Sequence, residues 1–166
     1  QDIPKEWFSA LRPKLQQMGG DLVDVKMLGP QFQMNWSNKL PHINHMTFAR
    51  YFIPDFVEED KVLYLDSDLV VTADLTPLFE MDLGDNYLAA AASCFGAGIG
   101  FNAGVLLINN KKWRAEAVRQ KLVELTDREH QHVSEGDQSI LNMLFQDSYI
   151  PLDHCYNFQI GFDSGA

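Results

Sequence analysis

Four short runs of apolar residues predict strands. Residues 21–28 (DLVDVKML) alternate between two sets of side chains, as a strand does. Residues 61–66 (KVLYLD), 87–94 (YLAAAASC) and 101–109 (FNAGVLLIN) are apolar with little polar alternation. Because such strands present few polar groups on either face, we expect them to be covered by helices on both sides.

Helical periodicity occurs between these runs. Pro13 predicts a kink or an early stop in the first helix, and Pro54 is expected to end the second, which is short and buried. Asp137 lies near the start of the last helix, where it can cap exposed amides. Buried strands interleaved with helices indicate an α/β fold. The predicted helices cover residues 3–20, 45–54, 111–130 and 136–145.

Length and composition are those of one globular domain. The chain has 166 residues, 46% hydrophobic and 22% charged, so we expect residues 1–166 to form a single domain. No apolar stretch approaches the ~20 residues that cross a bilayer, and no leader precedes the first helix. The formal net charge of -10 argues against a nucleic acid or an anionic membrane as partner.

Two cysteines, Cys94 and Cys155, are too few for a disulfide scaffold. Neither belongs to a CxxC pair, which would suggest a zinc or redox site. We therefore expect both to be free thiols in a reducing compartment.

Two aspartates, Asp66 and Asp68, stand at the end of an apolar run. If the strand continues through them, their side chains point to the same side, because alternate residues of a strand share a face. Two carboxylates held together repel unless a cation lies between them, and Mg2+ and Mn2+ prefer oxygen ligands. An acidic turn is the alternative. The buried strand favours the metal site, since open α/β sheets bind ligands at the carboxyl ends of their strands.

Two further segments carry candidate ligand-binding groups. Asn102, Ala103 and Gly104 begin an apolar strand, where small residues let a ligand approach the backbone and the amide can bind a polyol. A tight turn entering a core strand explains this pattern equally well. Asp137 and Gln138 present polar groups at a helix start, where helix capping is the alternative.

Arg50 lies in an otherwise apolar helix, MTFARYF. Buried arginine is rare unless it is paired, so we expect a carboxylate or a phosphate partner. From these residues alone, a structural salt bridge is the simpler explanation.

Together these segments resemble glycosyltransferase family 8, the retaining transferases that include bacterial lipopolysaccharide galactosyl- and glucosyltransferases. The resemblance covers most of residues 45–158, and four segments in order are more specific than any one. It implies a GT-A fold: an α/β nucleotide-binding domain with a mixed, mostly parallel sheet flanked by helices, incomplete at both ends here. The segments are MTFARYFIP, DKVLYLDSDLVVTADLTPLFEMDL, FNAGVLLINNKKW and GDQSILN.

The resemblance assigns the donor's diphosphate and ribose to the first half of the chain. Asp66 and Asp68 match the metal-binding DxD motif, in which Mn2+ or Mg2+ holds the diphosphate of a UDP-sugar. The backbone at Ser67 would lie near the ribose. Arg50 would face the donor phosphate or sugar.

The resemblance assigns the sugar itself to two later segments. Asn102, Ala103 and Gly104 would line the donor-sugar pocket. Asp137 and Gln138 are the catalytic candidates: the first would bind sugar hydroxyls, and the second would lie close to the anomeric carbon. A strand that grips uracil and a histidine that completes the metal site, both usual in the family, are not seen in this sequence.

The expected activity is therefore metal-dependent transfer of glucose or galactose, with retention, from a UDP-sugar to a glycan, lipid-linked or protein-linked acceptor. We expect a bacterial, cytoplasmic protein, with a peripheral place at the inner membrane face as an alternative. A degenerate nucleotide-sugar or glycan-binding module is the non-enzymatic alternative. A haloacid dehalogenase-type phosphatase also has DxD after an apolar strand, but its GDxxxD motif has Leu141 in the last position here.

Overall fold

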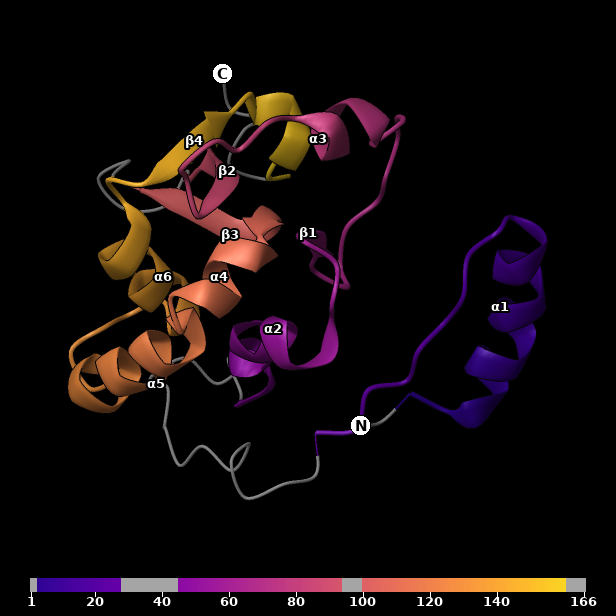
Figure 1. Cartoon of the computed structure of the whole chain (residues 1–166), viewed down its shortest axis with the longest axis horizontal. Coiled ribbons are helices and arrows are strands. Elements are labelled where there is room, and N and C mark those ends of the chain that lie inside the picture. Colours follow the sequence, from indigo (N-terminus) through magenta and orange to yellow (C-terminus); the bar gives the residue numbers. More distant parts are fainter. Residues whose placement is uncertain (1–2, 28–44, 94–99, 161–166) are drawn as a thin grey trace. The chain divides into compact units, whose positions relative to one another are not determined.

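The computed structural model describes residues 3–27, 45–93 and 100–160 (Figure 1). The chain forms two compact units, residues 1–34 and residues 35–166. Cys94 lies outside the described residues, so its expected free thiol is not placed. No helix within the described ranges is both long enough and apolar enough to span a membrane.

The first unit contains helix α1 (Lys5–Gln17), as predicted. Pro13 does not stop it early, since the helix continues to Gln17. The strand expected from residue 21 onward is wrong for residues 21–27, which have no regular secondary structure. A strand needs a hydrogen-bonding neighbour, and this unit's described part contains no second strand. The carbonyl of Leu22 instead accepts a hydrogen bond from Arg12 Nη2 at 2.7 Å.

The second unit is built on a four-stranded sheet of order β1-β3-β2-β4. β3 runs antiparallel to β1 and β2, whereas β2 runs parallel to β4. The sheet is mixed, as expected, but the expectation of mostly parallel pairing is wrong for the described strands. Residues 93–100 are too short for the crossover that would make β2 and β3 parallel. The strands are β1 (Lys61–Leu65), β2 (Leu88–Ala92), β3 (Phe101–Asn109) and β4 (Tyr149–Leu152).

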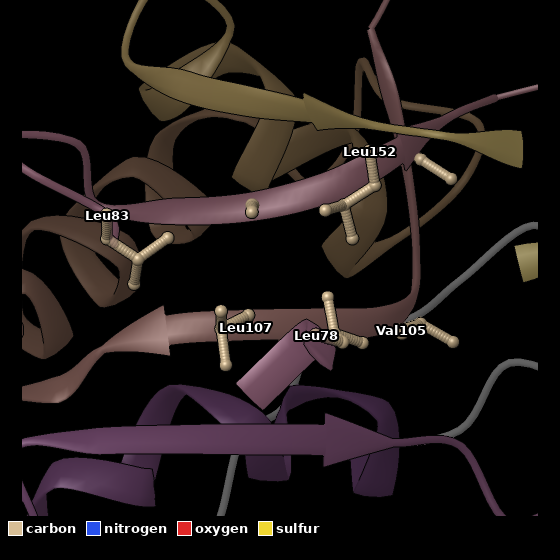
Figure 2. Packing of buried hydrophobic residues seen from close by; sticks show 7 residues of the cluster. Leu78, Leu83, Val105, Leu107 and Leu152 are labelled. Carbon is tan, nitrogen blue, oxygen red and sulfur yellow. The ribbon is translucent and has the colours of Figure 1, made fainter. Parts of the chain in front are cut away.

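One face of the sheet packs against α3 (Thr76–Glu80), a helix that the sequence analysis did not predict. Leu78 of α3 is fully buried in one cluster with Val105 and Leu107 of β3 (Figure 2). The two β3 residues share this face because they alternate along the strand. The buried cluster consists of Leu78, Leu83, Ala89, Ala91, Val105, Leu107 and Leu152.

The other face of the sheet is covered by helices on the side away from α3 (Figure 1). Leu106 and Ile108 of β3 point to this face and are fully buried. Trp113 stacks on Phe145 with ring centroids 5.5 Å apart, which joins two of the helices. Burial on both faces confirms the α/β class and explains why β3 is uninterruptedly apolar. The helices are α4 (Asn110–Ala115), α5 (Val118–Glu129) and α6 (Asp137–Phe145).

The single helix predicted over residues 111–130 is divided between α4 and α5. The break occurs at Ala117, whose φ of 52° is in the left-handed region. Trp113 and Val118 stand on either side of it, and both are buried. In a continuous helix, side chains five residues apart point ~140° apart. The break therefore lets both side chains enter the core.

The predicted short buried helix is present as the 3-10 helix η2 (His45–Phe52), continued by α2 (Ile53–Phe56). Phe48 and Tyr51 of η2 are almost completely buried. Pro54 does not end the segment, because it lies in the first turn of α2, where its missing N–H costs no hydrogen bond. This anchoring fixes the position of Arg50 on η2.

The register of β1 and β3 brings two predicted site segments to one end of the sheet. Leu65, the last residue of β1, pairs with Val105 near the start of β3. The backbone N–H of Asp66 then donates to the carbonyl of Gly104 at 2.9 Å. Since antiparallel strands place the end of one beside the start of the other, Asp66 and the Asn-Ala-Gly segment become neighbours.

Candidate functional site

The Asp-Ser-Asp segment leaves the sheet as a turn. β1 ends at Leu65, so the strand does not continue to Asp68, as the same-face argument required. Asp66 is half-buried, whereas Ser67 and Asp68 form an exposed turn. Asp66 alone of these three has side-chain contacts to the other candidate residues among those that the structure describes.

Arg50 lies at the centre of the site and has the carboxylate partners expected for it. Its Nε lies 2.8 Å from Asp137 Oδ2, and its Nη2 lies 3.3 Å from Asp66 Oδ1. Its Nη1 donates to the carbonyl of Ala103. The arginine is only 6% exposed, so these contacts lie in a medium that screens charge weakly.

Asp137 is the first residue of α6 and is 4% exposed. Burial raises the pKa of its carboxyl, although the Arg50 guanidinium and a hydrogen bond from Thr47 oppose the increase. Its Oδ2 is paired in charge with Arg50 but accepts no hydrogen bond from the described residues. A buried carboxylate oxygen with unused hydrogen-bonding capacity can accept a hydroxyl.

The Asn-Ala-Gly segment is a bulge at the start of β3. The β2 partner of Leu106 is Ala90, and that of Phe101 is Ala92, so residues 102–105 of β3 lie opposite a single residue of β2. The backbone groups of such a bulge need partners outside the normal ladder. The backbone groups of residues 102–105 therefore need hydrogen-bond partners outside β2.

Three predicted site segments provide those hydrogen bonds. Gln138 Oε1 accepts from Ala103 N at 2.9 Å, which ties α6 to the bulge. Asn102 Oδ1 accepts from Gly104 N at 2.8 Å within the bulge itself. The backbone N–H of Asp66, which follows β1, donates to the carbonyl of Gly104. The segments around positions 66, 103 and 138 are therefore in direct contact.

Gly104 lets two side-chain oxygen atoms pack closely against the bulge. A Cβ at this position would lie 3.1 Å from Asp66 Oδ2 and 3.0 Å from Asn102 Oδ1. Both distances are tighter than ordinary van der Waals contact, so any larger residue would press against these oxygens. The glycine thus allows a carboxylate and an amide oxygen to meet at one point of the backbone.

Three site residues were missed by the sequence analysis. The Tyr64 hydroxyl donates to Asp66 Oδ1 at 2.6 Å, and its ring lies under the Arg50 guanidinium, 4.5 Å from Cζ to the ring centroid. Asn157 Nδ2 donates to Asn102 Oδ1 at 2.8 Å from the 3-10 helix η3 (His154–Asn157). Asn142 Oδ1 accepts from Phe101 N at 2.7 Å. Tyr64 stands two residues before Asp66, and Asn142 is the last residue of the GDQSILN segment, so both lay in segments already singled out, whereas Asn157 carried no signal.

The structure brings most of the predicted residues together, but not all of them. Arg50, Asp66 and Asp137 form one charged cluster, which contacts the bulge and Gln138. Ser67 and Asp68 are exposed in the neighbouring turn. Within the described ranges, no group of three or more His, Cys, Asp or Glu side chains is arranged to hold a metal ion.

Comparisons with known proteins match nearly the whole chain. The family whose description is Glycosyl transferase family 8 matches residues 10–165. Glycosyltransferase GlyE of Streptococcus pneumoniae serotype 4 is 76% identical over 166 residues, which is 100% of this chain and 41% of that protein. Lipopolysaccharide glucosyltransferase WaaO of Escherichia coli K12 is 28% identical over 98% of this chain and 52% of its own sequence.

Two solved structures share the fold. The crystal structure of GlyE from S. pneumoniae TIGR4 superposes with a TM-score of 0.85 at 68% identity, and covers 100% of this chain and 39% of that one. The galactosyltransferase LgtC, solved with donor and acceptor sugar analogues, superposes with a TM-score of 0.78 at 32% identity, and covers 92% of this chain and 60% of that one. The chain therefore spans less than half of GlyE.

Proposed function

Because this chain belongs to glycosyl transferase family 8 and has the GT-A fold, we propose that it transfers a hexose from a UDP-sugar, with retention of configuration. Glucose and galactose are the proposed sugars, since the names of WaaO and LgtC refer to these transfers. The proposed acceptor is a glycan, free or linked to a lipid or protein. The exposed free thiol of Cys155 favours a reducing compartment, and we propose the cytoplasm.

The observation that carries the proposal is the convergence around Arg50. One buried guanidinium contacts Asp66, Asp137 and the carbonyl of Ala103. These groups belong to the segments assigned to the diphosphate, the sugar hydroxyls and the sugar pocket. A donor that spans these segments can therefore contact all three at once.

Asp66 and Asp68 would hold a divalent cation, Mn2+ or Mg2+. Carboxylate oxygens are the ligands that such ions prefer, and Asp66 is half-buried at the end of β1, with its Oδ2 beside Gly104. Asp68, exposed in the adjoining turn, would supply the second carboxylate. When bound, the ion would neutralise charge on the departing diphosphate.

The chain's own residues would bind and orient the donor. Arg50 would add positive charge beside the phosphates or the sugar in this acidic protein. Ser67, in the exposed turn, would present its backbone to the ribose. Asp137 Oδ2, buried and without a hydrogen bond among the described residues, would accept from a sugar hydroxyl.

We propose transfer on one face of the sugar, with the leaving diphosphate assisting deprotonation of the acceptor. Gln138 is a poor nucleophile, and its amide oxygen already binds Ala103 N. It would lie beside the anomeric carbon and orient the sugar. Trapping a glycosyl adduct on Asp137 would instead show a double displacement.

Turnover of UDP-glucose and UDP-galactose with and without Mn2+ tests the proposal. We expect metal-dependent release of UDP, and its loss in Asp68→Asn. Asp85→Asn is the matched control, since it also removes one exposed carboxylate but precedes the start of β2, at the opposite end of the sheet from the turn after β1. Metal-dependent turnover unchanged in Asp68→Asn contradicts the assignment. Donor binding without turnover in the wild type supports the alternative, a nucleotide-sugar binding module.

A further inference from the structure

Two amide side chains on α6 hold the start of β3. Gln138 and Asn142 are four residues apart, so they project from the same face of the helix, one turn apart. Gln138 binds the backbone N–H of Ala103. Asn142 binds both backbone groups of Phe101: its Oδ1 accepts from Phe101 N at 2.7 Å, and its Nδ2 donates to Phe101 O at 2.8 Å.

The Asn142 side chain therefore makes the hydrogen bonds that a neighbouring strand would make. Its amide presents one acceptor and one donor to a single residue, as a paired strand does. Phe101 immediately precedes the bulge that carries Asn102, Ala103 and Gly104. Fixing Phe101 at one end and Ala103 in the middle restricts the backbone path of the bulge.

Packing at Gly100 is a second, independent sign that Asn142 is closely fitted. A Cβ on Gly100 would lie 2.2 Å from Asn142 Oδ1 and 2.8 Å from its Cγ. Real Cβ atoms essentially never come this close, so a larger residue at position 100 would displace the Asn142 amide. The glycine, whose φ is +97°, thus lets the Asn142 amide reach Phe101.

A further hydrogen bond, the second from Nδ2, orients the Asn142 amide. Nδ2 also donates to the carbonyl of Gln138 at 2.9 Å. The two N–H groups thus bind two different carbonyls, which fixes which end of the amide faces Phe101 N. Replacing the donor by an oxygen would therefore bring three oxygen atoms into contact.

We propose that Asn142 is a positioning residue for the donor sugar: its amide sets the shape of the Asn102–Gly104 bulge, and through it the pocket for the hexose. This inference rests on the proposed function, because it assigns the bulge to the donor. Asn142 contacts Phe101 at the start of the bulge rather than the sugar, so it acts through Phe101.

The geometric half of the proposal is tested without any ligand. Amide hydrogen exchange followed by NMR reports Phe101 directly, and Leu107 in the same strand is the internal reference. In Asn142→Ala we expect exchange at Phe101 to accelerate by about tenfold or more, since its hydrogen-bond acceptor is removed. Exchange at Leu107 should stay unchanged. Unchanged exchange at Phe101 would overturn the proposal.

The functional half is tested with Asn142→Asp, which keeps the shape and the acceptor but loses both donors. With UDP-glucose and UDP-galactose as probes, we expect the donor KM and Kd to rise about tenfold or more. A purely structural residue would lower kcat through loss of folded protein and leave KM unchanged. Ile140→Val is the control for loosened α6 packing, and Met143→Ala, half-exposed on α6, is the control for surface change.

The outcomes separate this inference from the proposed function. A wild-type protein that neither binds nor turns over either UDP-sugar refutes the proposed function. The exchange experiment still tests whether Asn142 fixes the backbone of Phe101. A wild type that binds the donor, together with Asn142→Asp at unchanged donor KM, refutes the positioning role. An increase in KM equal to that of Ile140→Val does the same.

Discussion

Replacing Arg50 by methionine tests whether one buried cation balances the charges of the site. Nε of Arg50 lies 2.8 Å from Asp137 Oδ2, and the side chains of both residues are 6% exposed. Methionine keeps a long apolar stem but removes the charge, so Asp137 is left buried without its cation. Removing one partner of a buried ion pair costs about 3–5 kcal/mol. We expect the free energy of unfolding to fall by about this amount at neutral pH.

The loss should depend on pH, because the Asp137 carboxyl changes charge. Its pKa is already raised above 3.8 by burial, and Arg50 opposes that increase. Without Arg50 the folded-state pKa rises further, so the folded protein holds the proton to higher pH than the unfolded chain. Stability then decreases as pH rises from 3.8 through the folded-state pKa. Of the other groups facing Asp137, Tyr51 and Tyr64 stay neutral because burial raises their pKa, and Asp66 adds negative charge.

Urea unfolding followed by circular dichroism measures this effect at neutral pH and at acidic pH near 3.8. The deficit of Arg50→Met relative to wild type should be largest at neutral pH and shrink toward acid. The double variant Arg50→Met/Asp137→Asn should recover part of the loss, because the unpaired charge is gone. A neutral-pH loss below about 1 kcal/mol, the size of an exposed ion pair, would refute the reasoning. So would a deficit that is equal at both pH values.

Three further predictions each concern a single residue. Tyr64→Phe removes the 2.6 Å hydrogen bond to Asp66 Oδ1, so Mn2+ affinity, measured by electron paramagnetic resonance titration, should fall about tenfold. Gly104→Ala places a Cβ 3.1 Å from Asp66 Oδ2, so UDP-galactose binding measured by calorimetry should weaken about tenfold or more. Ala117→Gly relieves a φ of 52°, so the free energy of unfolding in urea should rise by about 1 kcal/mol.

Each of these variants has a control. Tyr64→Phe should leave the melting temperature nearly unchanged, and unaltered Mn2+ affinity would show that the hydroxyl does not orient Asp66. Gly20→Ala meets nothing closer than 3.6 Å and should not affect donor binding, so equal effects at both glycines would contradict the pocket. Ala115→Gly, at the last residue of α4, adds chain entropy without relieving a positive φ, so it should destabilise by about 0.5 kcal/mol, opposite in sign to Ala117→Gly.

The strands and helices that were predicted correctly are those with long apolar patterns. The predicted range for β3 coincides with the observed Phe101–Asn109 because both of its faces are buried. α3 was missed because five residues are too few to show helical periodicity. β4 was missed because it contains Pro151, which is tolerated there since β4 is an edge strand.

The candidate site could be predicted only where the sequence carries a local rule. The rule that buried arginine needs a partner predicted a carboxylate or a phosphate at Arg50, and the structure shows two carboxylates there. Asn142 ends the GDQSILN segment, but its contact with Phe101 joins residues far apart in the chain, so no local pattern predicted that partner. The strand argument for Asp68 failed because β1 ends at Leu65, where the chain turns toward solvent.

Because several segments hold the bulge of β3, the candidate site can form only after the last of these segments has been synthesised. The backbone of the bulge is held by Arg50, Asp66, Gln138 and Asn142, which come from three separate stretches of the chain. During synthesis from the N-terminus, β1 and β3 are complete before α6, and until α6 is made the bulge lacks the hydrogen bonds from Gln138 and Asn142. Transient detachment of α6 from the finished protein would likewise remove these bonds while leaving the β1–β3 ladder intact. If the bulge binds the donor as proposed, proteolysis or heat that loosens α6 should abolish donor binding before the sheet itself unfolds.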